Sequence, residues 1–250
     1  MVALLPVLGG HRMGEAFGRN GNCFRRGGAL KTPHLHAVFR HQRRTLQPNT
    51  QGFTKTFMVQ ILLVRAGCTD FDDQGRIQGT LDIPLNEAGE GQVAQLAAEL
   101  HAIKIDYLYA SPCRCAAQTA ETIAADHRLK VKTLEDLQNL DHGLWQGKLI
   151  EEVRTSQPRV FRQLQDHPET VCPPQGEAIG AALDRVRDVV TRLLRKHRTG
   201  IIAFVVPEPL ATLVGSILSH GEVGDLWKAE CTGGGWQLID VLPASAAIAG

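Results

Sequence analysis

The chain has 250 residues, 43% of them hydrophobic, which is enough apolar material for a full core. Its formal charge of +1 conceals an asymmetry: the first 57 residues carry nine Lys or Arg against one acid, and the remaining 193 carry eighteen against twenty-five. The acidic balance of the larger part argues against a nucleic-acid groove there, and no apolar run reaches the roughly 18–20 residues of a membrane span.

Residues 1–57 show no sustained hydrophobic period, and segments such as FRRGG and RHQRRTLQPNTQG hold too little apolar surface to fold. We therefore expect a disordered, basic N-terminal extension. Three interpretations stay open: an arm for nucleic acid or membrane, a transit peptide, which the lack of serine disfavours, and an upstream extension from a misplaced start codon. Met58 lies directly before the first expected strand and favours the third.

From Met58 onward, short apolar runs alternate with helical patterns. The predicted strands are MVQILLVR (58–65), IDYLYA (105–110), LKVKTL (129–134), GIIAFVV (200–206) and, at an edge, GWQLIDVL (235–242). Helices are expected after the turn at Gly89 and Gly91, over 115–127, over about 177–197 and over 208–220. This order predicts a three-layer α/β/α fold with a mainly parallel central sheet, formed by one domain at 58–250.

In such a sheet, ligands bind at the carboxyl ends of the strands, so the segments that follow the strands deserve inspection. The first is Arg65-Ala66-Gly67-Cys68-Thr69, continued by GRIQGTLDIPLNEAG. The others are SPCRCAAQTA (111–120), LQNLDHGLWQG (137–147), PPQGEA (173–178) and VPEP (206–209).

Taken in order and at this spacing, the five segments resemble the motifs of the histidine phosphatase superfamily, which has the phosphoglycerate mutase-like fold. The likeness covers nearly all of residues 58–242. It implies an α/β domain whose family activity is phosphomonoester hydrolysis or phosphoglycerate mutation through a nucleophilic histidine.

The residues that carry this chemistry in the family do not match. The nucleophilic histidine falls on Ala66, whose methyl group cannot accept a phosphoryl group. The second phosphate-binding arginine falls on Cys115, and Arg114, about 100° round a helix, is expected to point elsewhere. The acid falls on Asn139, which cannot donate and recover a proton, and the second histidine falls on Glu208.

What remains of the implied phosphate pocket is Arg65 with Thr69, and the Gln78-Gly79 corner. A guanidinium that has lost its neighbouring cation and histidines needs an anion, and Glu208 follows an adjacent strand end. We therefore expect Arg65 and Glu208 to form a salt bridge, directly or through one water.

Three further residues are candidates for lining the pocket: Cys68, Asp72 and His142. Asp72 would add a second carboxylate. A cysteine-dependent phosphatase needs an arginine six residues after its cysteine, and that position is Gln74 after Cys68. For His142 the alternative is a single histidine on the surface.

The sequence thus favours a catalytically inactive domain, a pseudophosphatase with a binding or regulatory role or a decayed paralogue. The alternative is a residual or altered phosphomonoester phosphatase that uses the remnant pocket. No cofactor and no metal are predicted, because no ligand spacing such as His-Glu-x-x-His occurs. The partner is left open between a protein and a weakly bound anionic small molecule, and scattered cysteines favour the cytoplasm.

Overall fold

The computed structural model of the chain describes residues 59–229 and 233–241. All of them belong to the unit formed by Gly52–Gly250. The extension predicted for residues 1–57 lies outside the described residues.

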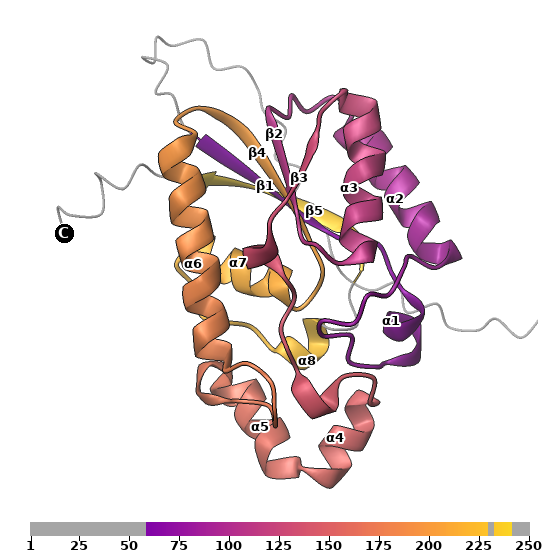
Figure 1. Cartoon of the computed structure of the whole chain (residues 1–250), viewed down its shortest axis with the longest axis vertical. Coiled ribbons are helices and arrows are strands. Elements are labelled where there is room, and N and C mark those ends of the chain that lie inside the picture. The colour runs from indigo at the N-terminus through magenta and orange to yellow at the C-terminus, as the bar shows by residue number, and fades with distance from the viewer. Residues whose placement is uncertain (1–58, 230–232, 242–250) are drawn as a thin grey trace, which may run out of the picture. The chain divides into compact units, whose positions relative to one another are not determined.

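Five strands form one sheet in the order β3-β2-β4-β1-β5 (Figure 1). The strands are β1 (Val59–Arg65), β2 (Tyr107–Ala110), β3 (Val131–Thr133), β4 (Gly200–Val206) and β5 (Gly235–Val241). The first four run parallel to their neighbours, and β5 pairs antiparallel with β1 at the edge. The predicted mainly parallel sheet, with its last strand at the edge, is confirmed.

Helices cover both faces of this sheet, as Figure 1 shows. α2 (Glu87–Leu100) and α3 (Arg114–His127) pack on the face that carries Leu62 and Val64. α6 (Ile179–Lys196) and α7 (Leu210–Ser219) pack on the face that carries Ile61 and Leu63. Since side chains alternate along a strand, the continuous apolar run of β1 supplies both cores.

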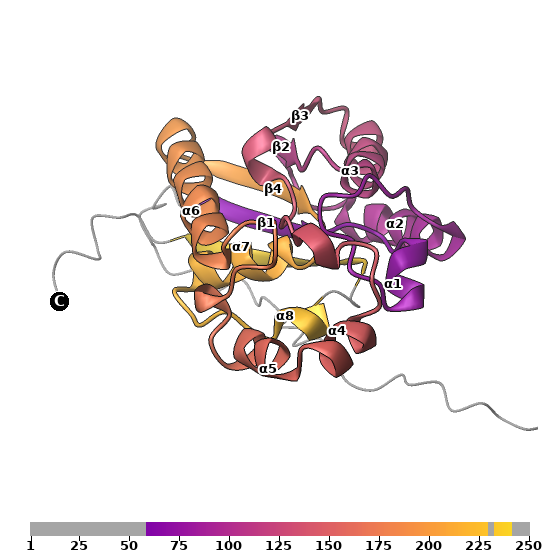
Figure 2. The ribbon, with the colours of Figure 1, turned by 60° about the horizontal axis from the view of Figure 1, so that its bottom comes forward.

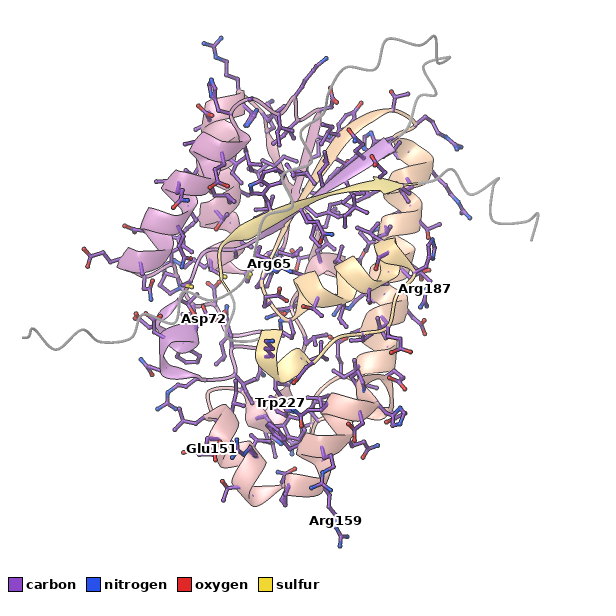
Figure 3. The ribbon with its side chains drawn as sticks, turned by 180° about the vertical axis from the view of Figure 1, so that it is seen from behind. Arg65, Asp72, Glu151, Arg159, Arg187 and Trp227 are labelled. Carbon is purple, nitrogen blue, oxygen red and sulfur yellow. The ribbon has the colours of Figure 1, made fainter. Side chains whose placement is uncertain are left out.

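A third apolar cluster lies beyond the carboxyl ends of the strands and was not predicted. It is built on three short helices, α4 (Ile150–Ser156), α5 (Pro158–Asp166) and α8 (Leu226–Ala229), which Figure 2 brings forward. Trp145 is fully buried in it, and Trp227, labelled in Figure 3, stacks on Phe161 with ring centroids 4.8 Å apart.

The start of α2 differs from the prediction, because Gly89 and Gly91 lie inside the helix rather than before it. Asn86 begins the helix by accepting a hydrogen bond from the Gly89 N–H at 2.8 Å, a role that suits asparagine. Within the described residues, no helix has the length and apolar character needed to cross a membrane.

Candidate functional site: a remnant phosphate pocket

The pairing of β1 with β4 brings the two most important site residues together. Arg65 ends β1 and lies in register with Val206, the last residue of β4. Glu208 follows Val206 by two positions in the loop that leaves β4. The Arg65 Nε–H donates to Glu208 Oε1. The predicted salt bridge is confirmed, and it is direct. Figure 3 labels Arg65 at the end of its strand.

The second oxygen of the Glu208 carboxylate is also used. Glu208 Oε2 accepts from Thr212 N at 3.0 Å and from Thr212 Oγ1 at 2.9 Å, which places the carboxylate at the first turn of α7, where the helix dipole favours a negative charge. Only 4% of the Glu208 side chain is exposed, against 32% for Arg65. Burial raises the pKa of Glu208 above its usual value, although Arg65 and Thr212 oppose that shift.

Ala66 stands directly beside this pair. Its N–H donates to the Val206 carbonyl at 3.0 Å, its carbonyl accepts from Gly234 N at 2.8 Å, and its methyl group belongs to the core on the α2–α3 face. The position offers no atom that could attack a phosphorus.

Asn139 ties two loops together instead of acting as an acid. Its Nδ2 donates to the Glu208 carbonyl at 3.0 Å and to the Gly79 carbonyl at 3.1 Å, and the side chain is buried. A carboxylate in the same place would face two carbonyl oxygens with no proton to offer them. The amide is therefore suited to hold the loop that carries Glu208 against the Gln78-Gly79 corner.

Cys115 contacts the same Gln78-Gly79 corner from the first turn of α3. Gln78 Nε2 donates to Cys115 Sγ at 3.6 Å, and both side chains are buried. Arg114 is exposed, and its backbone N–H donates to Asp82 Oδ1 at 2.8 Å at the start of α3. The expectation that Arg114 does not replace the missing second arginine is consistent with this orientation.

Asp72 serves the local fold. Its Oδ2 accepts from Thr69 N at 2.6 Å and from Thr69 Oγ1 at 2.8 Å, which forms a capping box for α1 (Asp70–Gln74). Thr69 and Asp72, which is labelled in Figure 3, thus satisfy each other. The prediction that Asp72 acts as a second pocket carboxylate gains no support from these contacts.

Cys68 is paired with α2: its N–H donates to Gln92 Oε1 at 3.0 Å, and Gln92 Nε2 donates to its Sγ at 3.2 Å. Burial raises the pKa of Cys68, so its thiol is less ready to become a nucleophile than a free cysteine. His142 is only 1% exposed, and the alternative of a surface histidine is wrong.

Sequence reasoning missed Thr212, which fixes the carboxylate of Glu208. A threonine four residues after an acid, in the first turn of a predicted helix, was the available signal. Among the described residues, no three His, Cys, Asp or Glu side chains lie close enough together to hold a metal ion.

A central, mainly parallel sheet covered by helices on both faces defines the class of fold, and the comparisons agree. A model of the histidine phosphatase superfamily (branch 1) matches residues 61–248. The chain belongs to that superfamily.

Curated relatives carry names from the same superfamily. The chain is 30% identical over 183 residues to phosphoserine phosphatase 1 of Hydrogenobacter thermophilus, covering 73% of this chain and 86% of that protein. It is 32% identical over 142 residues to phosphoglycerate mutase-like protein 4 of Arabidopsis thaliana, covering 56% and 62%. A solved mycobacterial glucosyl-3-phosphoglycerate phosphatase superposes with a TM-score of 0.63 at 22% identity, covering 72% of this chain and 88% of that one.

Proposed function

We propose that this chain is a catalytically inactive histidine phosphatase-like domain whose anion pocket is occupied by its own carboxylate. The observation that carries the proposal is the Arg65–Glu208–Thr212 network, which is centred on the buried Glu208 carboxylate. Glu208 supplies Arg65 with the negative charge that a phosphate would otherwise provide. Ala66 beside it offers no nucleophile, and Asn139 offers no acid.

The charge of the pocket argues in the same direction. A phosphate dianion next to Arg65 would lie near the Glu208 carboxylate, and two like charges about 4 Å apart repel by about 4 kcal/mol at an effective dielectric of 20. The cation that would offset this repulsion in the family is absent, because Cys115 stands in its place. The pocket therefore disfavours the ligand for which its scaffold is shaped.

The runner-up is a residual or altered phosphomonoesterase that uses the cysteines and His142. The raised pKa of Cys68 and the burial of Cys115 disfavour it. Free thiols at Cys68, Cys113, Cys115 and Cys172 support a reducing compartment such as the cytoplasm. The domain, which we take to begin near Met58, would act by binding a partner and not by turnover.

A phosphatase assay tests this. The names of the relatives make phosphoserine and 3-phosphoglycerate the natural substrates to try, beside p-nitrophenyl phosphate. We expect no turnover above the buffer background from the full chain, and none from Ala66→His alone, because catalytic residues that act as a unit are strongly non-additive.

Ala66→His combined with Cys115→Arg, Asn139→Glu and Glu208→His is the positive control for the scaffold. Detectable phosphohistidine in that variant would show that the assay can report activity in this fold. Turnover by the unmodified chain within about a hundredfold of the median enzyme kcat of about 10 s⁻¹ would refute the inactive assignment.

A further inference from the structure

Two cysteines that the proposed function does not use lie side by side at the start of α3. The Sγ atoms of Cys113 and Cys115 are 3.7 Å apart, and Ser111 Oγ donates to Cys113 Sγ at 3.4 Å. Both side chains are in the core that packs α3 against the sheet. The spacing results from the chain path, since Cys113 is the extended N-cap residue and Cys115 lies in the first turn.

The two thiols have different acidities. The hydrogen bond from the Cys115 thiol lowers the pKa of Cys113, with a further contribution from Ser111, although burial opposes the shift. The same pairing, together with burial, raises the pKa of Cys115. The first proton is therefore lost at a lower pH than from an isolated thiol and the second at a higher pH, as in a pair that shares a single negative charge. The first turn of a fourteen-residue helix also favours a thiolate.

Access separates the pair from ordinary surface thiols. Cys113 is 8% exposed and Cys115 is 1% exposed, whereas Cys172 is an exposed free cysteine. Exposure as low as that of Cys113 favours a small oxidant such as hydrogen peroxide over a tripeptide thiol or a protein oxidant.

We propose that Cys113 and Cys115 form a redox-active dithiol that hydroperoxides oxidise to an intrachain disulfide, in the wall of the remnant pocket. Cys113 is the attacking thiol and Cys115 the resolving thiol. This modification site is independent of whether the domain has phosphatase activity.

The chemistry balances with hydrogen peroxide as the two-electron oxidant. The Cys113 thiolate attacks one peroxide oxygen, the O–O bond breaks, and the leaving hydroxide takes a proton to become water. Cys113 is then a sulfenic acid. The Cys115 sulfur attacks the Cys113 sulfur, its thiol proton and the departing hydroxide form a second water, and the S–S bond closes. Two thiols and one peroxide give one disulfide and two waters.

Closing the bond has a structural consequence. The sulfurs must approach from 3.7 Å to the disulfide length of about 2.05 Å, which draws Cys115 Sγ toward Cys113. Cys115 Sγ is also the atom that accepts from Gln78 Nε2. Oxidation therefore changes the contact between the start of α3 and the Gln78-Gly79 corner.

Arg114 makes the disulfide simple to locate, because trypsin cuts between the two cysteines. After peroxide treatment of the full chain, the protein is denatured in the presence of an alkylating reagent, so that buried thiols are alkylated as well, and trypsin is then added. Reduced protein yields two separate alkylated peptides, 105–114 and 115–128. Oxidised protein should yield these two peptides joined and unalkylated, with a mass two hydrogens below the sum of the two free thiol peptides. Dithiothreitol should separate them.

The Cys172→Ser variant is the matched control, since it removes an exposed thiol elsewhere and should leave the linked pair unchanged. Cys115→Ser should stop the reaction at a Cys113 sulfenic acid that dimedone captures, and Cys113→Ser should leave Cys115 fully alkylated. Recovery of both peptides unlinked, at a peroxide dose that oxidises Cys172, would overturn the proposal. So would joining of either peptide to one that holds Cys68 or Cys172. The wild-type map alone decides the question if a variant fails to fold.

Discussion

Replacing Glu208 by glutamine tests the self-occupied pocket most directly. The change keeps the size of the side chain and leaves an amide oxygen that can still accept from the Thr212 N–H and hydroxyl, while it removes the charge that Arg65 uses. Arg65 should then be able to bind sulfate or phosphate. The structure supplies the magnitude as well as the direction of this effect.

Repulsion between a bound anion and the Glu208 carboxylate is about 4 kcal/mol at 4 Å and an effective dielectric of 20, so its removal sets an upper limit of roughly a thousandfold in affinity. Arg65 is about one third exposed, and solvent screening reduces that figure. We expect Glu208→Gln to bind sulfate roughly ten to a hundred times more tightly than the unmodified chain. Because Arg65 reaches water, the stability lost should stay at about 1–3 kcal/mol.

Isothermal calorimetry with sulfate at low ionic strength measures the affinity, and the rise of the unfolding midpoint with sulfate gives a second reading. Glu177→Gln is the matched control: it breaks another partly buried carboxylate–arginine pair, Glu177–Arg185 at 2.6 Å, outside the pocket. That variant should bind sulfate no better than the unmodified chain. A folded Glu208→Gln protein with equally undetectable sulfate binding would refute the reasoning.

Three more predictions concern the protonation of Glu208, the first turn of α2 and the amide of Asn139. Because burial raises the pKa of Glu208 above its usual value of 4.5, the contribution of this group to stability is full below pH 4.5 and is lost as the pH rises through the folded pKa. Lowering the pH through that range protonates Glu208 and should strengthen sulfate binding by the unmodified chain but not by Glu208→Gln. Calorimetric pH profiles that run parallel for the two proteins would contradict this. Gly89→Ala should destabilise the fold by several kcal/mol in urea unfolding, because its Cβ would meet the Cys68 carbonyl at 2.1 Å, whereas Gly91→Ala, with open space around it, should stabilise by up to about 1 kcal/mol. Asn139→Asp should cost about 1–3 kcal/mol at neutral pH by setting a carboxylate against two carbonyls, and an unchanged urea midpoint would show that the amide is dispensable.

Most of the strands could be predicted from the sequence because each one is a short apolar run that is visible without knowledge of its partners in the sheet. The Arg65–Glu208 pair was predictable for a related reason: parallel strands end at the same edge, so residues that follow two adjacent strands meet. The second inference also required β1 and β4 to be neighbours although they lie far apart in the sequence, and the resemblance to the superfamily supplied that adjacency.

The helices beyond the strand ends were missed because their burial depends on partners far along the chain. PRVFRQLQD is polar enough to be taken for a loop, and it joins a core by burying Leu164 and by stacking Phe161 on Trp227. The burial of His142 has a similar origin, since the loop at Gly176 covers it closely: a Cβ on Gly143 would lie 2.2 Å from the Pro174 carbonyl. No local pattern encodes such an approach.

The glycines of the first motif explain how the loop keeps its form with an alanine at position 66. A Cβ on Gly67 would lie 2.8 Å from the Gly89 carbonyl, so Gly67 and Gly89 together let the loop after β1 touch the first turn of α2. That contact is needed by the fold whatever residue stands at position 66. Arg65 is different, because a partly buried guanidinium requires an anion, and either a ligand or a side chain must supply it. Once Glu208 supplies it, a histidine restored at position 66 would face an occupied arginine. Recovery of phosphate binding therefore depends first on Glu208, and only then on Ala66.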